Sequence, residues 1–230
     1  EALSVQVHPN HRNASLTNGT PKTEAWVVLD AKPGAHLYAG LVPGTTETAL
    51  RTAVDGGAKV LERLLRYSVN AGDVLFVPGG MVHAIGAGCL IYEVQQSSNT
   101  TYRLYDWDRK DEQGRGRQLH VEQALKSIEY GIAPQPLRHL QDGITHNQWR
   151  TVVKSPFFRV RDVILAREQI VPMDGSSFIA VFVAEGEAVA SSCGKDVLLP
   201  RGTSALIPAC AEICSFKPAK GTARLLLSSL

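Results

Sequence analysis

The chain of 230 residues has no strong charge bias and no long apolar run, and these absences exclude several classes of protein. Its formal net charge is only +2, with no basic run, so nothing indicates a nucleic-acid or membrane surface. No apolar stretch approaches the roughly 20 residues of a membrane span. No signal-peptide pattern opens the sequence either. We therefore expect neither a nucleic-acid nor a membrane partner.

Cysteine is also scarce. The four cysteines show neither the even spacing of a disulfide framework nor a C-x-x-C metal motif; they are Cys89, Cys193, Cys210 and Cys214. None lies near the histidine-containing segments described below, so thiolate ligation of a metal is not expected. We interpret them as buried or free thiols in the reducing environment of the cytoplasm.

Short strands dominate the predicted secondary structure. Helical spacing is limited to residues 45–67, interrupted at Gly56-Gly57, and to 121–130, which Gly131 terminates. The predicted strands are 3–8, 25–29, 74–77, 90–95, 102–107, 158–165, 178–184 and 225–228. Many short strands at fairly regular spacing are typical of a sandwich or barrel and not of a βαβ sheet. The predicted fold class is therefore mainly β, with a few short helices.

Two domains are predicted, 1–135 and 150–230, joined by a linker at 136–149 that contains Pro136 and Gly143 and has little periodicity. The halves share a weak echo, because the Gly-x5-Pro spacing at 72–78 recurs at 202–208. After His146, however, the sequence contains no histidine. The second half is therefore expected to share the fold of the first without a metal site.

Candidate metal ligands cluster in the first half. His83 follows a short apolar strand and the turn Pro78-Gly79-Gly80, His8 closes the predicted strand 3–8, and Glu24 begins another. A lone histidine is more often an ordinary residue than a ligand. Two imidazoles and a carboxylate in such contexts favour a site for a borderline divalent ion such as zinc, with a position left open for substrate.

Gln6 shares a strand face with His8, since alternate residues of a strand project to the same side. Its amide is interpreted either as a further oxygen ligand or as a donor that supports the ligands. His11 is the nearest competitor of His8, but it has the opposite parity and lies in a polar loop. We therefore expect His8, not His11, at the site.

A second group of polar residues comprises Glu93, Arg103 and Lys22. If residues 90–107 form a hairpin, Glu93 and Arg103 could form a plain cross-strand ion pair. Beside a metal, the planar, permanently charged guanidinium would instead stabilise a developing anion or hold a phosphate. Lys22, two residues before Glu24, is either a further cation of the same pocket or a solvated lysine.

These segments carry a resemblance. The run Gly-x5-Pro-x-Gly-x2-His at 72–83 is similar to the second cupin motif. Together with Ser-Val-Gln-Val-His-Pro, Lys-Thr-Glu-Ala-Trp and Asn-Thr-Thr-Tyr-Arg-Leu-Tyr-Asp-Trp-Asp-Arg, it resembles type I mannose-6-phosphate isomerase in its short bacterial form. The second half is similar to the degenerate C-terminal cupin domain of that family. The resemblance implies two jelly-roll barrels.

The same resemblance implies one Zn2+ per chain and interconversion of mannose 6-phosphate and fructose 6-phosphate through a cis-enediol. The implied ligands are His8, Glu24 and His83, with Gln6 contributing in some members. Arg103 matches the catalytic arginine of the family. Glu93 and Lys22 stand where members have pocket residues.

The start of the chain departs from the family, whose members carry a further segment before the strand that contains His8. We accordingly expect the first barrel to lack its N-terminal strands, with unpaired edges. A non-catalytic metal- or sugar-binding module is the alternative function. An iron-dependent dioxygenase is a third, because the same ligands suit Fe(II). Both alternatives leave Lys22 and Arg103 without a role.

Overall fold

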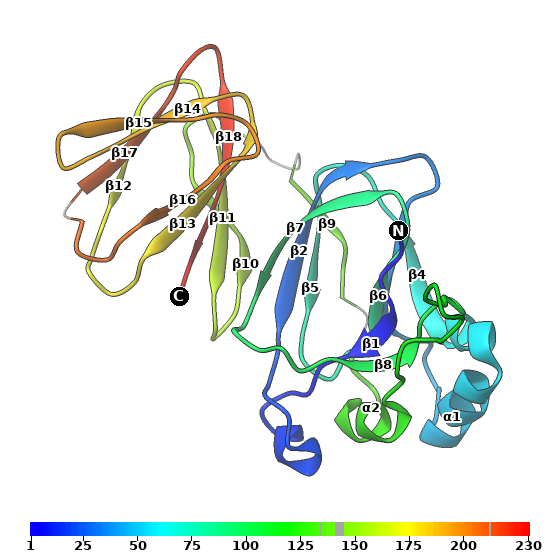
Figure 1. Cartoon of the computed structure of the whole chain (residues 1–230). Helices are drawn as coiled ribbons and strands as arrows, with labels where there is room; N and C mark the ends of the chain where they lie inside the picture. The colour runs from blue at the N-terminus through cyan, green and yellow to red at the C-terminus, as the bar shows by residue number, and fades with distance from the viewer. Residues whose placement is uncertain (134, 141–144, 212) are drawn as a thin grey trace. The chain divides into compact units, whose positions relative to one another are not determined.

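The computed structural model describes residues 1–133, 135–140, 145–211 and 213–230. The chain divides into two compact units, Glu1–His139 and Leu140–Leu230 (Figure 1). Of the linker predicted at 136–149, residues 141–144 lie outside the described residues. Within the described part of the chain, no helix has the length and apolar character needed to cross a membrane.

The first unit is built from two antiparallel sheets. Its strands are β1 (Val5–Val7), β2 (Glu24–Ala31), β3 (His36–Leu41), β4 (Leu64–Ser68), β5 (Asp73–Val77), β6 (His83–Ile85), β7 (Cys89–Gln95), β8 (Tyr102–Tyr105) and β9 (Arg138–His139). One sheet has the order β4-β3-β6-β1-β8 and the other β7-β2-β5-β9. β1 is an inner strand, paired with β6 on one side and β8 on the other.

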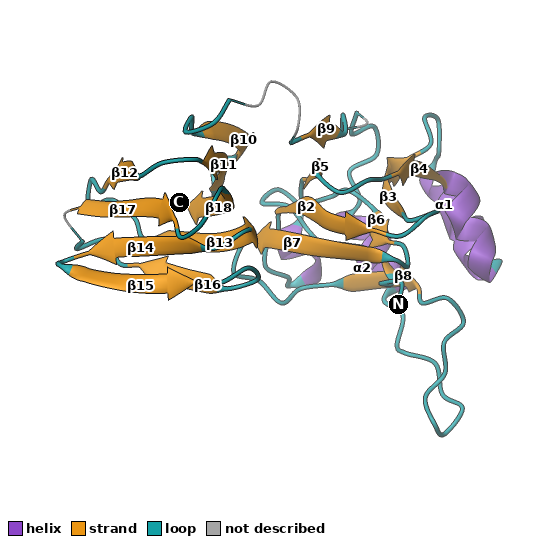
Figure 2. Cartoon of the chain, turned by 90° about the horizontal axis from the view of Figure 1, so that it is seen from above, coloured by secondary structure: helices purple, strands orange, loops and turns teal. Residues whose placement is uncertain are grey.

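The helices among the described residues are short, and both α-helices, α1 (Glu47–Asp55) and α2 (Val121–Ser127), belong to the first unit (Figure 2). Two 3-10 helices, η1 (Ala14–Thr17) and η2 (Gly57–Arg63), accompany them. The helix predicted over 45–67 is therefore wrong beyond residue 63. Residues 64–68 form β4 instead, because hydrogen bonding to β3 overrides their helical spacing.

Two apolar clusters stabilise the first unit. One packs α1 and α2 against strands of the first sheet and includes Leu50, Leu104 and Leu125. The other includes Trp26 and Leu75 of the second sheet and Leu37 and Met81 from β3 and the turn before β6. Trp26 shares a face of β2 with Glu24, so the metal-ligand candidate lies beside buried apolar side chains.

The second unit repeats this plan with nine strands among its described residues. They are β10 (Arg150–Lys154), β11 (Arg159–Leu165), β12 (Gln169–Pro172), β13 (Ile179–Glu185), β14 (Ala188–Ser192), β15 (Lys195–Leu199), β16 (Ser204–Ile207), β17 (Ile213–Pro218) and β18 (Ala223–Ser229). The sheet orders are β10-β11-β18-β13-β16 and β12-β17-β14-β15. All pairs are antiparallel, so the predicted mainly-β class is confirmed.

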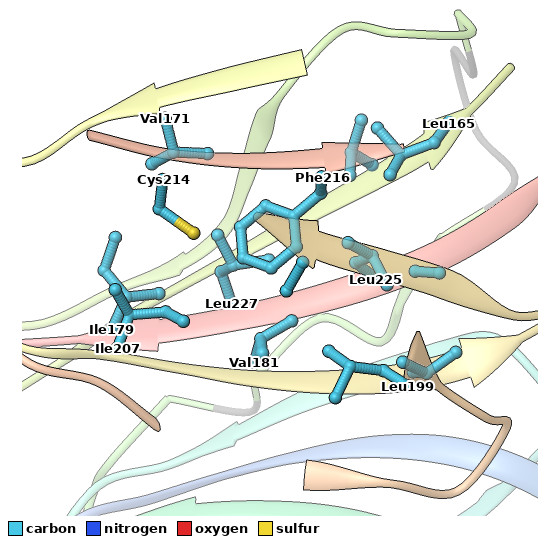
Figure 3. Packing of buried hydrophobic residues seen from close by; sticks show 14 of the residues in the cluster. Leu165, Val171, Ile179, Val181, Leu199, Ile207, Cys214, Phe216, Leu225 and Leu227 are labelled. Carbon is cyan, nitrogen blue, oxygen red and sulfur yellow. The ribbon is translucent and has the colours of Figure 1, made fainter. Parts of the chain in front are cut away.

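A cluster of buried apolar side chains fills the interior of the second unit (Figure 3). Phe216 of β17 lies at its centre, with no exposed surface, and packs among side chains of the other sheet such as Val181, Leu225 and Leu227. The Gly-x5-Pro echo has a structural basis, because Gly72 and Gly202 both have a positive φ, at 95° and 80°, at the turn before a short strand. Such a turn favours glycine in both units.

Candidate metal centre

Three side chains from different strands converge inside the first unit. His8 directly follows β1, Glu24 begins β2 and His83 begins β6, and each residue is only 1% exposed. His8 Nε2 lies 3.0 Å from Glu24 Oε1, and His83 Nε2 lies 3.6 Å from Glu24 Oε2. The predicted ligands are thus brought together, with all three ligand atoms within 4.8 Å of one another. No other such group occurs among the described residues.

The backbone fixes which nitrogen of each imidazole is available. His8 Nδ1 lies 2.7 Å from the carbonyl oxygen of Thr100, and His83 Nδ1 lies 2.9 Å from that of Met81. A carbonyl can only accept, so both Nδ1 atoms carry the proton and donate it. In its neutral form each ring would therefore present the lone pair of Nε2 to the interior, which is the tautomer that metal-binding histidines adopt.

The donor set fits a divalent cation. His8 Nε2 is buried and has no hydrogen-bond partner, although it faces Glu24, because a lone pair and a carboxylate are both acceptors. A tetrahedral ion with bonds of about 2.1 Å separates its ligand atoms by about 3.4 Å. His8 Nε2 lies 3.0 Å from one oxygen of Glu24 and His83 Nε2 lies 3.6 Å from the other, both close to that value, and all three ligand atoms lie within 4.8 Å of one another. A cation held between these three atoms would satisfy the orphaned nitrogen.

Gln6 lies beside this group. Its Nε2 is 3.3 Å from His83 Nε2, and its Oε1 accepts a hydrogen bond of 2.9 Å from Ser4 Oγ. In this arrangement the amide faces His83 with its nitrogen, so it acts as a donor to a candidate ligand. Ligation by the amide oxygen, the other predicted role, requires rotation of the amide group.

Lys22 also reaches the centre. Its Nζ lies 2.7 Å from Glu24 Oε1, and the residue is only 8% exposed, so it is not a solvated loop lysine. Strand parity does not explain this position, because β2 begins at Glu24. Burial raises the pKa of Glu24, but the His8, His83 and Lys22 side chains lower it by more, and the carboxyl stays ionised.

The pKa values of two neighbouring groups, His83 and Glu93, shift in opposite directions. Burial lowers the pKa of His83 to about 4, so its imidazole is neutral around pH 7. Glu93 lies on β7, where its partner across the sheet is Trp26, and it therefore shares the face of Glu24. Burial and the charge of Glu24 raise the pKa of Glu93 to about 7. Glu93 thus belongs to the same group as the candidate ligands.

Arg103 joins the site through the register of the first sheet. Gln6 of β1 lies opposite His83 of β6 on one side and opposite Arg103 of β8 on the other. Directly opposed residues of antiparallel strands project to the same face, so the three form one row. Arg103 Nε is buried and has no hydrogen-bond partner. Burial, followed by the charge of Arg117, lowers the pKa of Arg103.

The predicted hairpin that would pair Glu93 with Arg103 is wrong. β7 pairs with β2, whereas β8 pairs with β1 in the other sheet. Consequently, no ion pair joins Glu93 and Arg103 in the described part of the chain. The two residues enter the interior from different sheets, and the plain cross-strand salt bridge is excluded as their explanation.

The Pro78-Gly79-Gly80 turn has a steric reason. A Cβ atom at Gly79 would lie 2.7 Å from the carbonyl oxygen of Pro9, and Gly80 has a φ of +92°. The Gly80 N–H donates a 2.7 Å hydrogen bond to the carbonyl of His8. The two glycines therefore allow the segment before His83 to contact the segment after His8, which sets the spacing of the two imidazoles.

Glu129, which follows α2, braces the same two segments. Its carboxylate accepts a hydrogen bond of 2.7 Å from Asn10 Nδ2 and also pairs with Arg12. Its backbone N–H donates to the carbonyl of Gly80 at 2.9 Å. The sequence did not reveal this role, because an isolated glutamate 119 positions from Asn10 gives no signal. The carbonyls of Thr100 and Met81 were equally unpredictable, since any residue supplies one.

A mainly-β domain with two imidazoles and one carboxylate in its interior is the arrangement of a cupin-type metal site. No protein-family model matches the chain. "Mannose-6-phosphate isomerase ManA" of Bacillus subtilis (strain 168) is 38% identical over 187 residues, 80% of this chain and 58% of that protein. "Putative mannose-6-phosphate isomerase YvyI" of the same organism is 30% identical over 236 residues, 100% of this chain and 72% of that protein.

Among solved structures, the mannose 6-phosphate isomerase from Bacillus subtilis matches with a TM-score of 0.84 and 28% identity, covering 100% of this chain and 72% of that one. The chain thus belongs to the mannose-6-phosphate isomerase family. It spans 58% of ManA and 49% of a mannose-6-phosphate isomerase from Streptococcus mutans.

Proposed function

We propose that the protein is a zinc-dependent aldose–ketose isomerase that interconverts mannose 6-phosphate and fructose 6-phosphate through a cis-enediol. The printed names of the relatives support the substrates. The observation that carries the proposal is the joint placement of a His8–Glu24–His83 group and of Arg103, which shares a sheet row with His83. A simple metal-binding module needs no arginine there.

The reaction moves a proton between C1 and C2 of the open-chain sugar. It requires a base that removes the proton and returns it to the other carbon, and a group that stabilises the enediolate. A divalent ion held by His8, Glu24 and His83 would supply Lewis-acid polarisation of the sugar oxygens. Arg103 is proposed to stabilise the negative charge that develops on those oxygens.

Glu93 and Lys22 are the proposed proton-transfer or phosphate-holding groups, and their environments differ. Lys22 Nζ is held at 2.7 Å by Glu24 and keeps that carboxylate ionised and oriented. Glu93 is the second carboxyl group on this face, and the structure gives it no cationic partner within ion-pair distance among the described residues. Glu93 is thus the better placed of the two to accept and return a proton.

The test combines metal analysis with a coupled assay for fructose 6-phosphate formation. The expected result is about one zinc per chain and isomerisation that disappears in His83→Ala. The matched control is His146→Ala, an exposed histidine outside the site, which should keep both metal and rate. Bound zinc without isomerisation in the full-length protein would favour the non-catalytic binding module, and bound iron would favour the dioxygenase.

A further inference from the structure

The second unit, which has no histidine after His146, carries a polar pocket of its own. The cavity has a volume of about 200 Å3. Its lining includes Arg159, Arg161, Asp174, Ser176, Ser177 and Ser229. Two arginines line this one small cavity, in a unit whose described residues contain no metal-ligand group, and their placement requires an explanation.

The two arginines lie on the core-facing side of β11, Arg159 exposed and Arg161 half-buried. On β11 they alternate with buried residues and share a strand face with Val163 and Leu165, which belong to the apolar core. Ser229 of β18 lies directly opposite Arg159. The guanidinium of Arg161 lies over the ring of Trp149, 5.6 Å from the ring centroid, and this contact orients it. The pocket therefore lies at the end of the core, and Arg161 is held in place there by Trp149.

No carboxylate of the described residues forms an ion pair with either arginine. In the same sheet, by contrast, Arg150 and Arg224 both pair with Asp162 at 2.8 Å. The lining includes Asp174, but its Oδ1 accepts hydrogen bonds of 2.9 and 2.6 Å from Ser176 N and Oγ. Asp174 and Leu230 thus line the cavity without an ion pair to either guanidinium, and both guanidinium groups keep donors available for an anion.

Further cations lie close to these two arginines. Burial, followed by the charge of Arg159, lowers the pKa of Arg161. Lys154 of β10 lies directly opposite Arg159 and adds a third cation at the edge of the sheet. An anion between these groups would relieve their mutual repulsion and accept hydrogen bonds from both guanidinium forks.

We propose that this pocket of the second unit binds a phosphate group, either as inorganic phosphate or as the phosphate of a small monoester. Planar guanidinium forks match the geometry of phosphate oxygens. The cavity is smaller than the ~300–1,000 Å3 typical of larger organic ligands, so a compact anion fits it best. The proposal concerns a site separate from the proposed metal centre and does not depend on isomerase activity.

The experiment is a titration of the 15N-labelled full chain with inorganic phosphate and, in parallel, with glycerol 3-phosphate, followed by backbone amide shifts. The amides of Ser176, Ser177 and Ser229 should shift and saturate with at least one of the two probes. Arg161→Gln should weaken that binding about tenfold or more, since it removes charge-assisted hydrogen bonds. Arg167→Gln, an exposed arginine outside the pocket, is the matched control and should bind as the parent does.

The variant Arg159→Gln and the amide signals of the first unit serve as two further controls. Arg159→Gln removes the charge of an exposed side chain and should weaken binding without loss of folding, so it carries the test if Arg161→Gln does not fold. Residues of the first unit report separately on phosphate at the proposed active site. Shifts of the second-unit amides that fail to saturate, or that persist unchanged in Arg159→Gln and Arg161→Gln, would overturn the proposal.

Discussion

The two units place their buried charges on opposite sides of similar sheets. In the first, Lys22, Glu24 and two imidazoles lie in the interior. In the second, Asp162 and Arg224 are 1% and 3% exposed but lie on the face of β11 and β18 opposite to the core. A buried charge is tolerated only where partners satisfy it. The comparison shows that the same sheet architecture can place a charged group in its interior or on the opposite face. The charged group lies on the face where residues of opposite charge can pair with it.

Loss of a metal-ligating side chain should have the largest effect, measured on metal affinity and on isomerisation. Glu24→Gln removes the charge that faces both imidazoles and leaves Lys22 without its partner. Changes in groups that merely support ligands cost about 10–100-fold in metal affinity, so we expect a loss of at least about 100-fold, together with loss of isomerisation. The metal content of the protein after dialysis against a chelator measures the loss of affinity. Retention of metal by Glu24→Gln would exclude Glu24 as a ligand.

The charges of the second unit should matter for stability instead. Asp162→Asn leaves the buried Arg224 without its close carboxylate partner. Breaking such a pair costs about 3–5 kcal/mol, measured as the free energy of unfolding in urea. Asp196→Asn, which removes an exposed ion pair with Lys217 at 3.7 Å, is the control and should cost at most about 1 kcal/mol. Equal costs would show that the Asp162 network contributes little.

Arg103→Ala tests catalysis without altering the ligands. If Arg103 stabilises the enediolate, turnover should fall about 10²–10³-fold while the bound metal is retained. Turnover from the coupled assay and metal content from the same preparation give the two readouts. A near-normal rate would contradict the role, and loss of metal would show that Arg103 acts on the structure of the site.

The brace at Glu129 should have the smallest effect. Glu129→Ala removes the acceptor of Asn10 and loosens the segments that carry His8 and His83, so we expect metal affinity to fall about tenfold. Glu129→Gln keeps an oxygen acceptor and should lose less. Glu122→Ala, an exposed residue of α2 that pairs with Arg51, is the control. Competition against a chelator gives the affinities, and equal values for Glu129→Ala and Glu122→Ala would exclude the brace.

Local sequence predicted the parts of the molecule that depend on short-range pattern. Strands such as β5, β11 and β13 followed from apolar runs bounded by turns, and the glycines before His83 indicated a tight turn. The resemblance of the motifs to those of the family added Arg103 to the predicted site, and its catalytic role stays a prediction. Pairing was not predictable. Residues 64–68 became a strand because β3 lies beside them, and Glu93 and Arg103 entered different sheets. Such outcomes depend on contacts between distant segments.

The row of His83, Gln6 and Arg103 across β6, β1 and β8 also bears on folding. β1 has only three residues, so few hydrogen bonds define its alignment. A shift by one residue would turn Gln6 to the opposite face and move His8 away from Glu24. Under the proposed function, an ion binds only the correctly aligned chain and stabilises it by mass action. Metal supply during synthesis would then select the native register of this strand.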